Sequence, residues 1–194
     1  MFESHHISRH FEKRCRQTHR KTRRKALQAQ TNRRRAATVK RLPKLSLAVQ
    51  ASSHLILAAR ATTGGGADYA HFAPLLTRAV TRAGLDVALA DAGYDSEPNH
   101  RLARIDLGVR SLIPATSGRP GSGPPKGRYR RLMRRRLARG PDKKLYGQRW
   151  QVETVNSMIK RNLGSACRSR STRGRKKDML LRALTHNLMI LANL

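Results

Sequence analysis

Residues 85–91 read LDVALAD, a short and almost wholly apolar run that ends on an acid. A run of this kind, without polar alternation, is typical of a β-strand buried on both faces. Directly upstream, residues 69–83 carry apolar side chains at helical spacing, and Gly84 ends the pattern. A strand that follows a helix in this way is predicted to pair in parallel with an earlier strand. The stretch therefore predicts an α/β fold.

The flanking segments extend this pattern in both directions. Upstream, KLSLAVQ at 44–50 and HLILAARAT at 54–62 are apolar β-formers that predict an antiparallel hairpin. Downstream, residues 99–106 predict a short amphipathic helix, and VRSLIP at 109–114 predicts another strand. The remaining predicted segments are an exposed loop at 115–128, a helix at 143–163, a basic loop at 168–177 and a closing helix at 179–194. The order ββαβαβ, then helices, predicts a small mixed sheet.

The charge balance indicates a polyanionic partner. The chain has 42 Lys and Arg residues against 11 Asp and Glu residues, a net charge of +31 over 194 residues. Such a charge seeks a polyanion, and the prevalence of Arg favours bidentate contacts with phosphates. Residues 1–42 contain a basic tract at 9–41 and predict a loose N-terminal segment beside a folded domain at 43–194. Composition alone favours a non-enzymatic, ribosomal-protein-like nucleic-acid-binding protein.

Cysteine content and hydropathy argue against several other classes of protein. Two cysteines, Cys15 and Cys167, cannot form a disulfide framework or a four-ligand zinc site by themselves. His and Cys residues crowd positions 5–19, but their spacing matches no standard zinc module, so we predict no zinc site there. The N-terminus has no apolar signal-peptide core, and residues 179–194 are too short and too polar to span a bilayer. The sequence thus predicts a reduced, cytoplasmic setting and no membrane partner.

Residues 146–160 (YGQRWQVETVNSMIK) carry the strongest functional pattern. If they form one α-helix, a stripe within about 60° of arc carries a phenol, a guanidinium, a carboxylate and an ammonium: Tyr146, Arg149, Glu153 and Lys160. A carboxylate among cations suits metal-dependent phosphoryl transfer, because the carboxylate holds a divalent cation and the cations hold the phosphate. The alternative is a solvated helix face on which Arg149 and Glu153 form an ordinary ion pair.

Asp91 stands where the buried strand at 85–91 ends, in the sequence ADAGYDS. Active-site groups of α/β sheets gather at the carboxyl ends of strands, because the loops there diverge and leave a crevice. Ala92 and Gly93 are small, which lets a metal ion or a phosphodiester approach the backbone. The alternative is that Asp91 only caps the turn that follows the strand.

Together these motifs resemble a known family. DAGYDS around Asp91, followed by Y-x2-R-x3-E-x6-K around Glu153, resembles the DDE transposases of bacterial insertion sequences. The subgroup is the one with the Tyr-Arg-Glu-Lys signature, insertion-sequence-four-like and five-like, and the resemblance covers most of residues 43–194. It implies an RNase H-like mixed sheet flanked by helices. It also implies Mg²⁺ or Mn²⁺ ions held by three carboxylates, hydrolysis at transposon ends, and strand transfer into target DNA.

The resemblance also assigns roles to single residues. Asp91 resembles the second carboxylate and Glu153 the third, both as catalytic metal ligands, whereas Asp95 in the same motif does not resemble a ligand. The positions thought to contact DNA near the cleaved phosphate are Tyr146, Arg149 and Lys160. A basic tract at 126–139 adds Arg134, Arg135 and Arg136 as DNA-binding residues, and Arg161 follows Lys160. The resemblance implies a bacterial, nucleoid-associated protein and allows a homo-oligomer of the intact form.

The first carboxylate of the family is not found. In the family it ends the first core strand, in a D-[ST]-x-G-like segment before a stretch like FESHHIS, which here starts at Phe2. Glu3 and Glu12 are poor substitutes, and Asp68 follows the glycine turn in the wrong place. We therefore expect an N-terminally truncated transposase chain that lacks the first core strand and is inactive alone. A translated remnant that interferes with the full enzyme stays open as an alternative.

The charge predicts strongly salt-dependent binding to DNA. If the chain neutralises about 6 to 10 phosphates, the logarithm of the binding constant falls with the logarithm of the salt concentration at a slope of about −0.9 per phosphate. Affinity for a DNA duplex is then expected to drop by orders of magnitude between low and physiological salt, with little sequence preference. Fluorescence anisotropy titrations at several salt concentrations measure the slope, and a flat response contradicts the prediction.

Overall fold

The computed structural model describes residues 28, 43–63, 67–116, 123–140 and 142–193. The chain divides into two units, Met1–Leu42 and Pro43–Leu194, and the second unit is the one described below. The predicted basic tract at 9–41, the His and Cys residues at 5–19, and the acids Glu3 and Glu12 lie outside the described residues.

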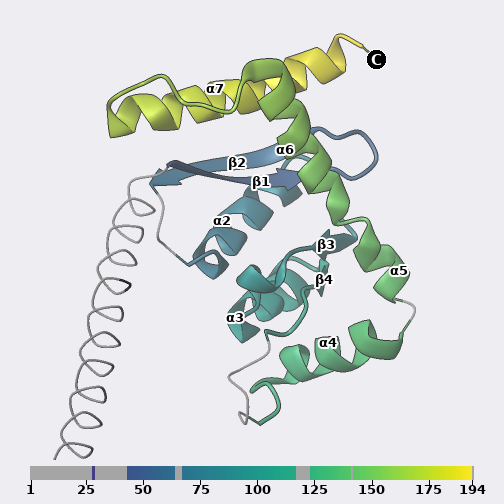
Figure 1. Ribbon diagram of the computed structural model, residues 1–194. Helices are drawn as coiled ribbons and strands as arrows, with labels where there is room; N and C mark the ends of the chain where they lie inside the picture. Colours follow the sequence, from purple (N-terminus) through teal and green to yellow (C-terminus); the bar gives the residue numbers. More distant parts are fainter. Residues whose placement is uncertain (1–27, 29–42, 64–66, 117–122, 141, 194) are drawn as a thin grey trace, which may run out of the picture. The chain divides into compact units, whose positions relative to one another are not determined.

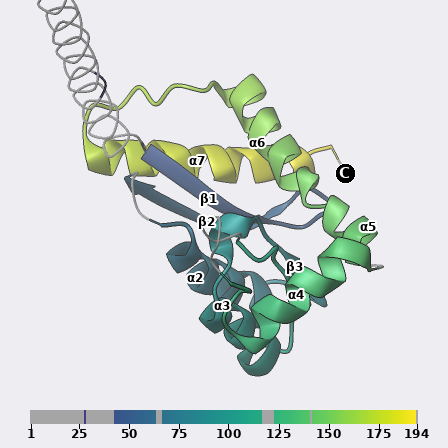
Figure 2. The same cartoon turned by 60° about the horizontal axis from the view of Figure 1, so that its bottom comes forward.

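The predicted antiparallel hairpin is confirmed. Strand β1 (Pro43–Val49) pairs with β2 (Ile56–Thr63), and a bulge interrupts the register between Ala48 and Val49. Helices α6 (Trp150–Leu163) and α7 (Thr172–Leu191) cover one face of the hairpin and α2 (Tyr69–Val80) covers the other (Figures 1 and 2). Side chains alternate across a strand, and the apolar residues on the first face join a buried cluster made by Ile56, Val155, Ile159 and Ala183. The hairpin is therefore the middle layer between helices.

Asn187 fastens α7 to the start of β2. Its Oδ1 accepts a hydrogen bond from the Ile56 N–H at 2.8 Å, and its Nδ2 donates to the Ile56 carbonyl at 2.9 Å.

Helix α7 begins at Thr172, so the basic loop predicted at 168–177 is wrong in its second half. The Ser171 hydroxyl accepts a hydrogen bond from the Gly174 N–H at 3.0 Å. A helix cap of this kind stabilises the first turn of α7.

The predicted strand at 85–91 forms, but its predicted partner is wrong. Strand β3 (Val87–Leu89) pairs in parallel with β4 (Arg110–Leu112), which comes later in the chain, and not with an earlier strand. The described residues therefore contain two separate two-stranded sheets in place of one small mixed sheet. The α/β class holds. A cavity lies between β1 and β3, and the two strands are not paired with each other.

A second apolar core packs α2 against the β3–β4 pair. The helix predicted at 99–106 is present as α3 (Glu97–Arg101) followed by a π-helical segment, η2 (Leu102–Asp106). The buried residues of this core are Phe72, Leu76, Ala103, Val109 and Ile113. This core holds the 3₁₀ turn η1 (Ala92–Tyr94), which follows β3, through partly buried Tyr94.

The helix predicted at 143–163 is divided in two. Helix α4 (Arg128–Arg139) is followed by α5 (Asp142–Gly147), and α6 begins only at Trp150. Between α5 and α6 the backbone turns more tightly, since the Arg149 N–H bonds the Tyr146 carbonyl at 3.0 Å and the Val152 N–H bonds the Arg149 carbonyl at 3.2 Å. Residues 117–122 of the predicted loop lie outside the described residues. In the described part of the chain, no helix is long and apolar enough to cross a membrane.

Candidate functional site

Asp91 lies just beyond the carboxyl end of β3, where it begins the turn η1. The residue is exposed, and its Oδ1 accepts a hydrogen bond from the Ala92 N–H at 2.8 Å. The turn-capping role that the sequence left open is thus present. Because this cap uses one carboxylate oxygen, Asp91 keeps a second oxygen with which it can bind a cation.

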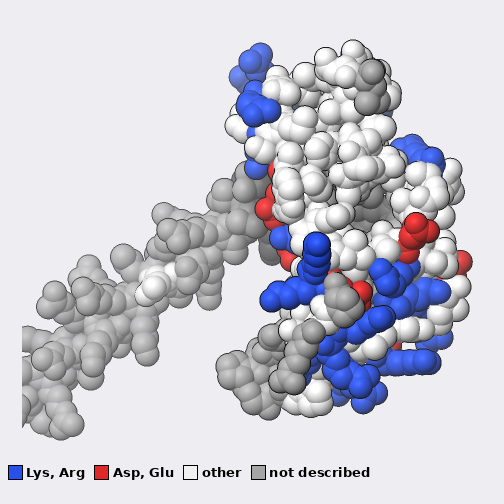
Figure 3. Space-filling model, turned by 90° about the vertical axis from the view of Figure 1, so that its right-hand side faces the viewer, with Lys and Arg blue, Asp and Glu red and all other residues white. Residues whose placement is uncertain are grey.

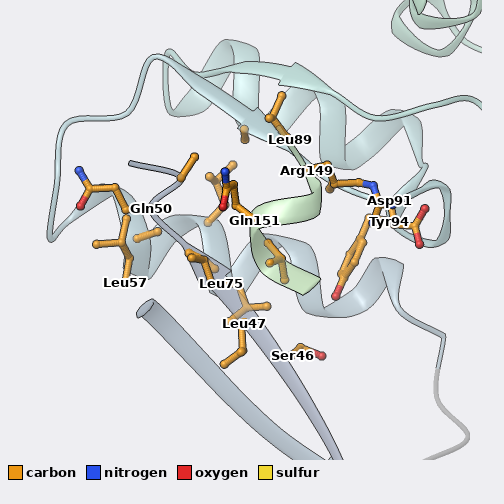
Figure 4. Close-up of a pocket in the computed structure, with 18 of the residues that line it drawn as sticks. Ser46, Leu47, Gln50, Leu57, Leu75, Leu89, Asp91, Tyr94, Arg149 and Gln151 are labelled. Carbon is orange, nitrogen blue, oxygen red and sulfur yellow. The ribbon is translucent and has the colours of Figure 1, made fainter. Parts of the chain in front are cut away.

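Arg149 lies between the two carboxylates that the sequence predicts to bind metal. Its Nη2 is 2.9 Å from Oε1 of Glu153, and its guanidinium also interacts electrostatically with Asp91. Figure 4 shows the Arg149 side chain reaching toward Asp91 at one end of a cavity. Partial burial acts to lower the pKa of Arg149. The hydrogen bond to Glu153 and the charges of Tyr146 and Asp91 outweigh burial and raise this pKa above its ordinary value. The end of β3 and the start of α6, far apart in the sequence, therefore meet at one guanidinium.

Tyr146 belongs to the same group of side chains. The tight turn between α5 and α6 places Tyr146 and Arg149 one above the other, because side chains three residues apart eclipse in a 3₁₀ turn. Burial raises the pKa of the Tyr146 phenol, with a contribution from Asp91 and Glu153, and Arg149 opposes the rise. The protonated phenol can donate a hydrogen bond to a phosphate oxygen. The break in the predicted helix thus keeps this pair of side chains aligned.

Lys160 and Arg161 are not part of this cluster. Both are exposed on α6 and lie about two helical turns beyond Glu153. Neither lines the cavity that Asp91 and Arg149 border. Their contact with DNA stays a prediction.

No third acid completes a metal site within the described residues. There, no group of three or more His, Cys, Asp or Glu side chains could hold an ion. Asp68 forms an ion pair with Lys44 instead. Mg²⁺ prefers carboxylate oxygens, so Asp91 and Glu153 match this ion in kind but are too few to fix it firmly. Their role as metal ligands stays a prediction.

Asp95 has a structural role close to this site. Its side chain is completely buried, and Nη2 and Nε of Arg130 donate to its Oδ2 at 2.7 and 2.9 Å. The Thr116 N–H donates to the same oxygen at 2.7 Å. Burial would raise the pKa of Asp95, but the hydrogen bonds from Arg130 and Thr116 lower it below its usual value. Asp95 therefore ties η1 to α4.

Glu97 caps α4 from a different element. The N–H groups of Tyr129 and Arg130, in the first turn of α4, donate to its Oε1 and Oε2 at 3.0 and 3.1 Å. A carboxylate at this end also complements the helix dipole. Gly127, which precedes the helix, has φ of 105°, and a Cβ there would collide with the Glu97 carboxylate. The glycine is therefore required by both its backbone conformation and this close approach.

The arginines of α4 line a surface groove. Its volume is about 490 Å³, and its lining residues are Pro124, Pro125, Arg128, Arg131, Arg134 and Arg135. In Figure 3, Lys and Arg side chains crowd the lower part of the face shown, whereas in its upper part they stand mainly at the edges. Guanidinium groups gathered along one helix are suited to bind successive phosphates of a nucleic acid.

Arg136 behaves differently from its two neighbours. Its Nε is 3.0 Å from Oδ2 of the buried Asp142, and Arg110 lies 3.9 Å from the same carboxylate. Arg136 thus joins α4 to α5 and is already neutralised by an acid. Arg134 and Arg135 are exposed and line the groove. The DNA-binding role predicted for all three residues is therefore best retained for Arg134 and Arg135.

Sequence reasoning missed Glu97, Arg130 and the groove residues Arg128 and Arg131. The groove leaves a signal, because Arg128, Arg131 and Arg135 follow helical spacing. Glu97 and Arg130 leave none, since each acts on a partner more than 30 residues away.

His100 lies beneath the Asp95 cluster and is completely buried. Its Nδ1 is 2.8 Å from the Ser111 hydroxyl, and its Nε2 is 3.7 Å from Oδ1 of Asp95. Burial lowers the pKa of His100, and Arg104 and Arg130 act in the same direction against the opposite effect of the nearby acids. The imidazole therefore stays neutral in the folded protein at neutral pH.

Comparison with known proteins identifies one family. Residues 4–188 match the family described as Transposase DDE domain. No curated protein and no solved structure matches the chain. The matched region contains the end of β3 with Asp91 and the start of α6 with Glu153.

The state of His100 predicts a pH dependence of stability. Folding lowers the pKa of His100 from its ordinary value of 6.5. As the pH falls, His100 therefore takes up a proton in the unfolded chain before it does so in the folded protein. The free energy of unfolding is expected to fall below pH 6.5, by at most about 1.4 kcal/mol per pH unit from this group. Urea denaturation at several pH values measures this slope. His100→Gln should reduce it, and an unchanged slope in this variant contradicts the assignment.

Proposed function

We propose, on the premise that this chain belongs to the DDE transposase family, that it binds DNA along its arginine-rich surfaces and does not cleave DNA by itself. A transposase acts on DNA, and membership of this family argues against the ribosomal-protein-like alternative. The single observation that carries the proposal is Arg149, which contacts Glu153 and interacts with Asp91. In this arrangement one guanidinium interacts with acids from two motifs that are far apart in the sequence.

The same motifs support finer assignments. We assign Asp91 and Glu153 as the second and third carboxylates of the family, and we place the chain in the Tyr-Arg-Glu-Lys subgroup. The α/β class, the hairpin β1–β2 and the parallel pair β3–β4 are compatible with an RNase H-like fold. Tyr146 and Arg149 then contact the phosphate next to the acids, as a hydrogen-bond donor and a cation.

The metal requirement of the family explains the expected lack of cleavage. DDE transposases use divalent metal ions, and two-metal phosphoryl transfer needs one ion for the attacking oxygen and one for the leaving oxygen. The residues of this chain that would hold such an ion are Asp91 and Glu153. Mg²⁺ keeps most of its waters unless several oxygen ligands are fixed around it, and two exposed carboxylates provide few. On this proposal, Asp91 and Glu153 supply two of the three carboxylates that the family uses.

The groove of α4 provides a second surface for DNA, separate from the acids. Asp95 and Glu97 hold the first turn of α4, the helix that carries these arginines. We propose that Arg134 and Arg135 contact the DNA backbone in a way that does not depend on base sequence.

Removing two groove arginines tests this surface. In Arg134→Ala/Arg135→Ala the slope of log affinity against log salt is expected to become less steep by about 0.9 for each phosphate that the variant no longer neutralises. The matched control is Arg60→Ala/Arg78→Ala, which removes two exposed cations outside the groove. Anisotropy titrations of a random duplex compare the variants. Equal slopes for the two double variants would show that the groove has no special part in binding.

A nicking assay tests the proposed lack of cleavage. The purified 194-residue chain, incubated with supercoiled plasmid and Mg²⁺ or Mn²⁺, is expected to shift the plasmid in a gel without converting it to the open circle. Asp91→Ala should behave in the same way. Metal-dependent nicking by the wild type that disappears in Asp91→Ala would mean that the catalytic site is complete, and the proposal fails.

A further inference from the structure

The outer side of helix α7 carries a row of exposed leucines. The other side of this helix contributes Met179, Ala183 and His186 to the buried interior, and Figure 1 shows α7 along the top of the described unit with the hairpin β1–β2 below it. Four side chains on the outer side are 60%, 56%, 57% and 55% exposed, in chain order Leu181, Leu184, Leu188 and Leu191. Single apolar side chains are ordinary on a surface, but four on one side of one helix indicate a docking surface. These four residues are called the leucine row below.

The spacing of the leucine row matches the seam between two packed helices. Steps of three, four and three residues return the chain to the same side of a helix, as at the a and d positions of a coiled coil. These steps also read the same in both directions along the chain. Two copies of α7 that lie antiparallel about a two-fold axis level with residue 186 therefore place Leu181 of one copy opposite Leu191 of the other, and Leu184 opposite Leu188. The row is thus complementary to itself.

The absence of charge along this row favours a second copy as the occupant. Residues 183–194 contain no Lys, Arg, Asp or Glu, in a chain with a net charge of +31. Arg182 lies next to the row but is engaged elsewhere, since it pairs with Asp178 and donates to the Ala166 carbonyl at 2.7 Å. Two copies of such a basic chain repel each other, and they approach at the lowest cost through a surface without cations. An acidic partner would instead be attracted to the arginine-rich surfaces.

The basic segment RGRKK at 173–177, in the first turns of α7, selects the direction of the pair. In a parallel pair the two basic segments would lie side by side and repel each other. In the antiparallel pair they lie at opposite ends, and Lys177 of each copy stands about one helical turn beyond Leu191 of the other. There it meets the carbonyl end of a helix, where a cation is favourable. Charge thus favours the antiparallel arrangement that the spacing permits.

We propose that the leucine row of α7 docks against the leucine row of a second copy of this chain, as an antiparallel helix pair. Each copy then covers four leucines that are more than half exposed in the single chain. The arginine groove of α4 lies at the opposite end of the described unit in Figure 1, and its lining residues all fall within 124–135. The pair therefore carries two such grooves. Docking depends on the leucine row alone and does not require that the chain bind DNA.

Sedimentation velocity of the full chain without DNA tests the proposal. At about 1 M salt, where the Debye length is about 3 Å and repulsion between the copies is screened, a dimer is expected. At about 0.1 M salt the repulsion returns and the dimer is expected to weaken. Leu184→Gln/Leu188→Gln replaces two exposed side chains at the centre of the pair and should weaken dimerisation at least about 100-fold. The control Tyr69→Gln/Ile105→Gln replaces two side chains outside α7 that are 52% and 58% exposed, and it should keep the dimer.

Disulfide cross-linking tests the direction of the pair. In a Cys15→Ser/Cys167→Ser background, chains with Leu181→Cys and chains with Leu191→Cys are oxidised separately and as a mixture. The mixture is expected to form a cross-linked dimer, because the two positions lie opposite each other. Each variant alone should not, because the two copies of one position lie about 15 Å apart along the helices and a disulfide needs Cα atoms within about 7 Å.

Three results would overturn the proposal. A monomer at both salt concentrations would mean that no second copy covers the row. A dimer that survives Leu184→Gln/Leu188→Gln unchanged would place the contact on another surface. Cross-linking of Leu181→Cys alone, as efficient as that of the mixture, would show that the helices do not pair in the antiparallel register.

Discussion

The carboxylate of Asp95 is completely buried; Arg130 of α4 neutralises it, and Thr116, in the segment after β4, donates a further hydrogen bond to it. A buried charge without a partner is strongly destabilising, so these elements hold their places only together. Two residues later, Glu97 caps the first turn of α4. The short segment from Asp91 to Glu97 therefore presents an exposed acid at one end and fixes the arginine helix at the other.

Other acids of this basic chain also form ion pairs that connect or stabilise secondary-structure elements. Asp68 pairs with Lys44, Asp142 with Arg136, and Asp178 with Arg182. The first pair joins β1 to the start of α2, and the second joins α4 to α5. The third lies within α7, and its Arg182 also donates hydrogen bonds to the Gly164 and Ala166 carbonyls. With a net charge of +31 the chain repels itself, and neutralisation at the joints lets the other cations stay on the surface for phosphates.

The acids at Asp91 and Glu153 differ from these joint-forming acids because both are exposed. Arg149 supplies positive charge to both acids. Asp91 and Arg149 also stand at one end of the cavity between β1 and β3.

The sequence by itself determined the local elements and the pair Arg149–Glu153. Apolar runs predict β1, β2, β3 and α2, because burial on one or both faces imposes a periodicity that is visible in the residues. An i,i+4 ion pair needs only helical spacing, and the tight turn before α6 did not disturb it. The family resemblance likewise rests on short motifs.

Only the tertiary structure decided how distant residues combine. The partner of β3 depends on which edge is accessible, and the sequence carries no record of an edge. Burial of Asp95 depends on Arg130, and the cap of α4 depends on Glu97, both of which approach from separate elements. Sequence periodicity reports the environment of one element at a time, whereas pairing, capping in trans and cavities are properties of elements packed together.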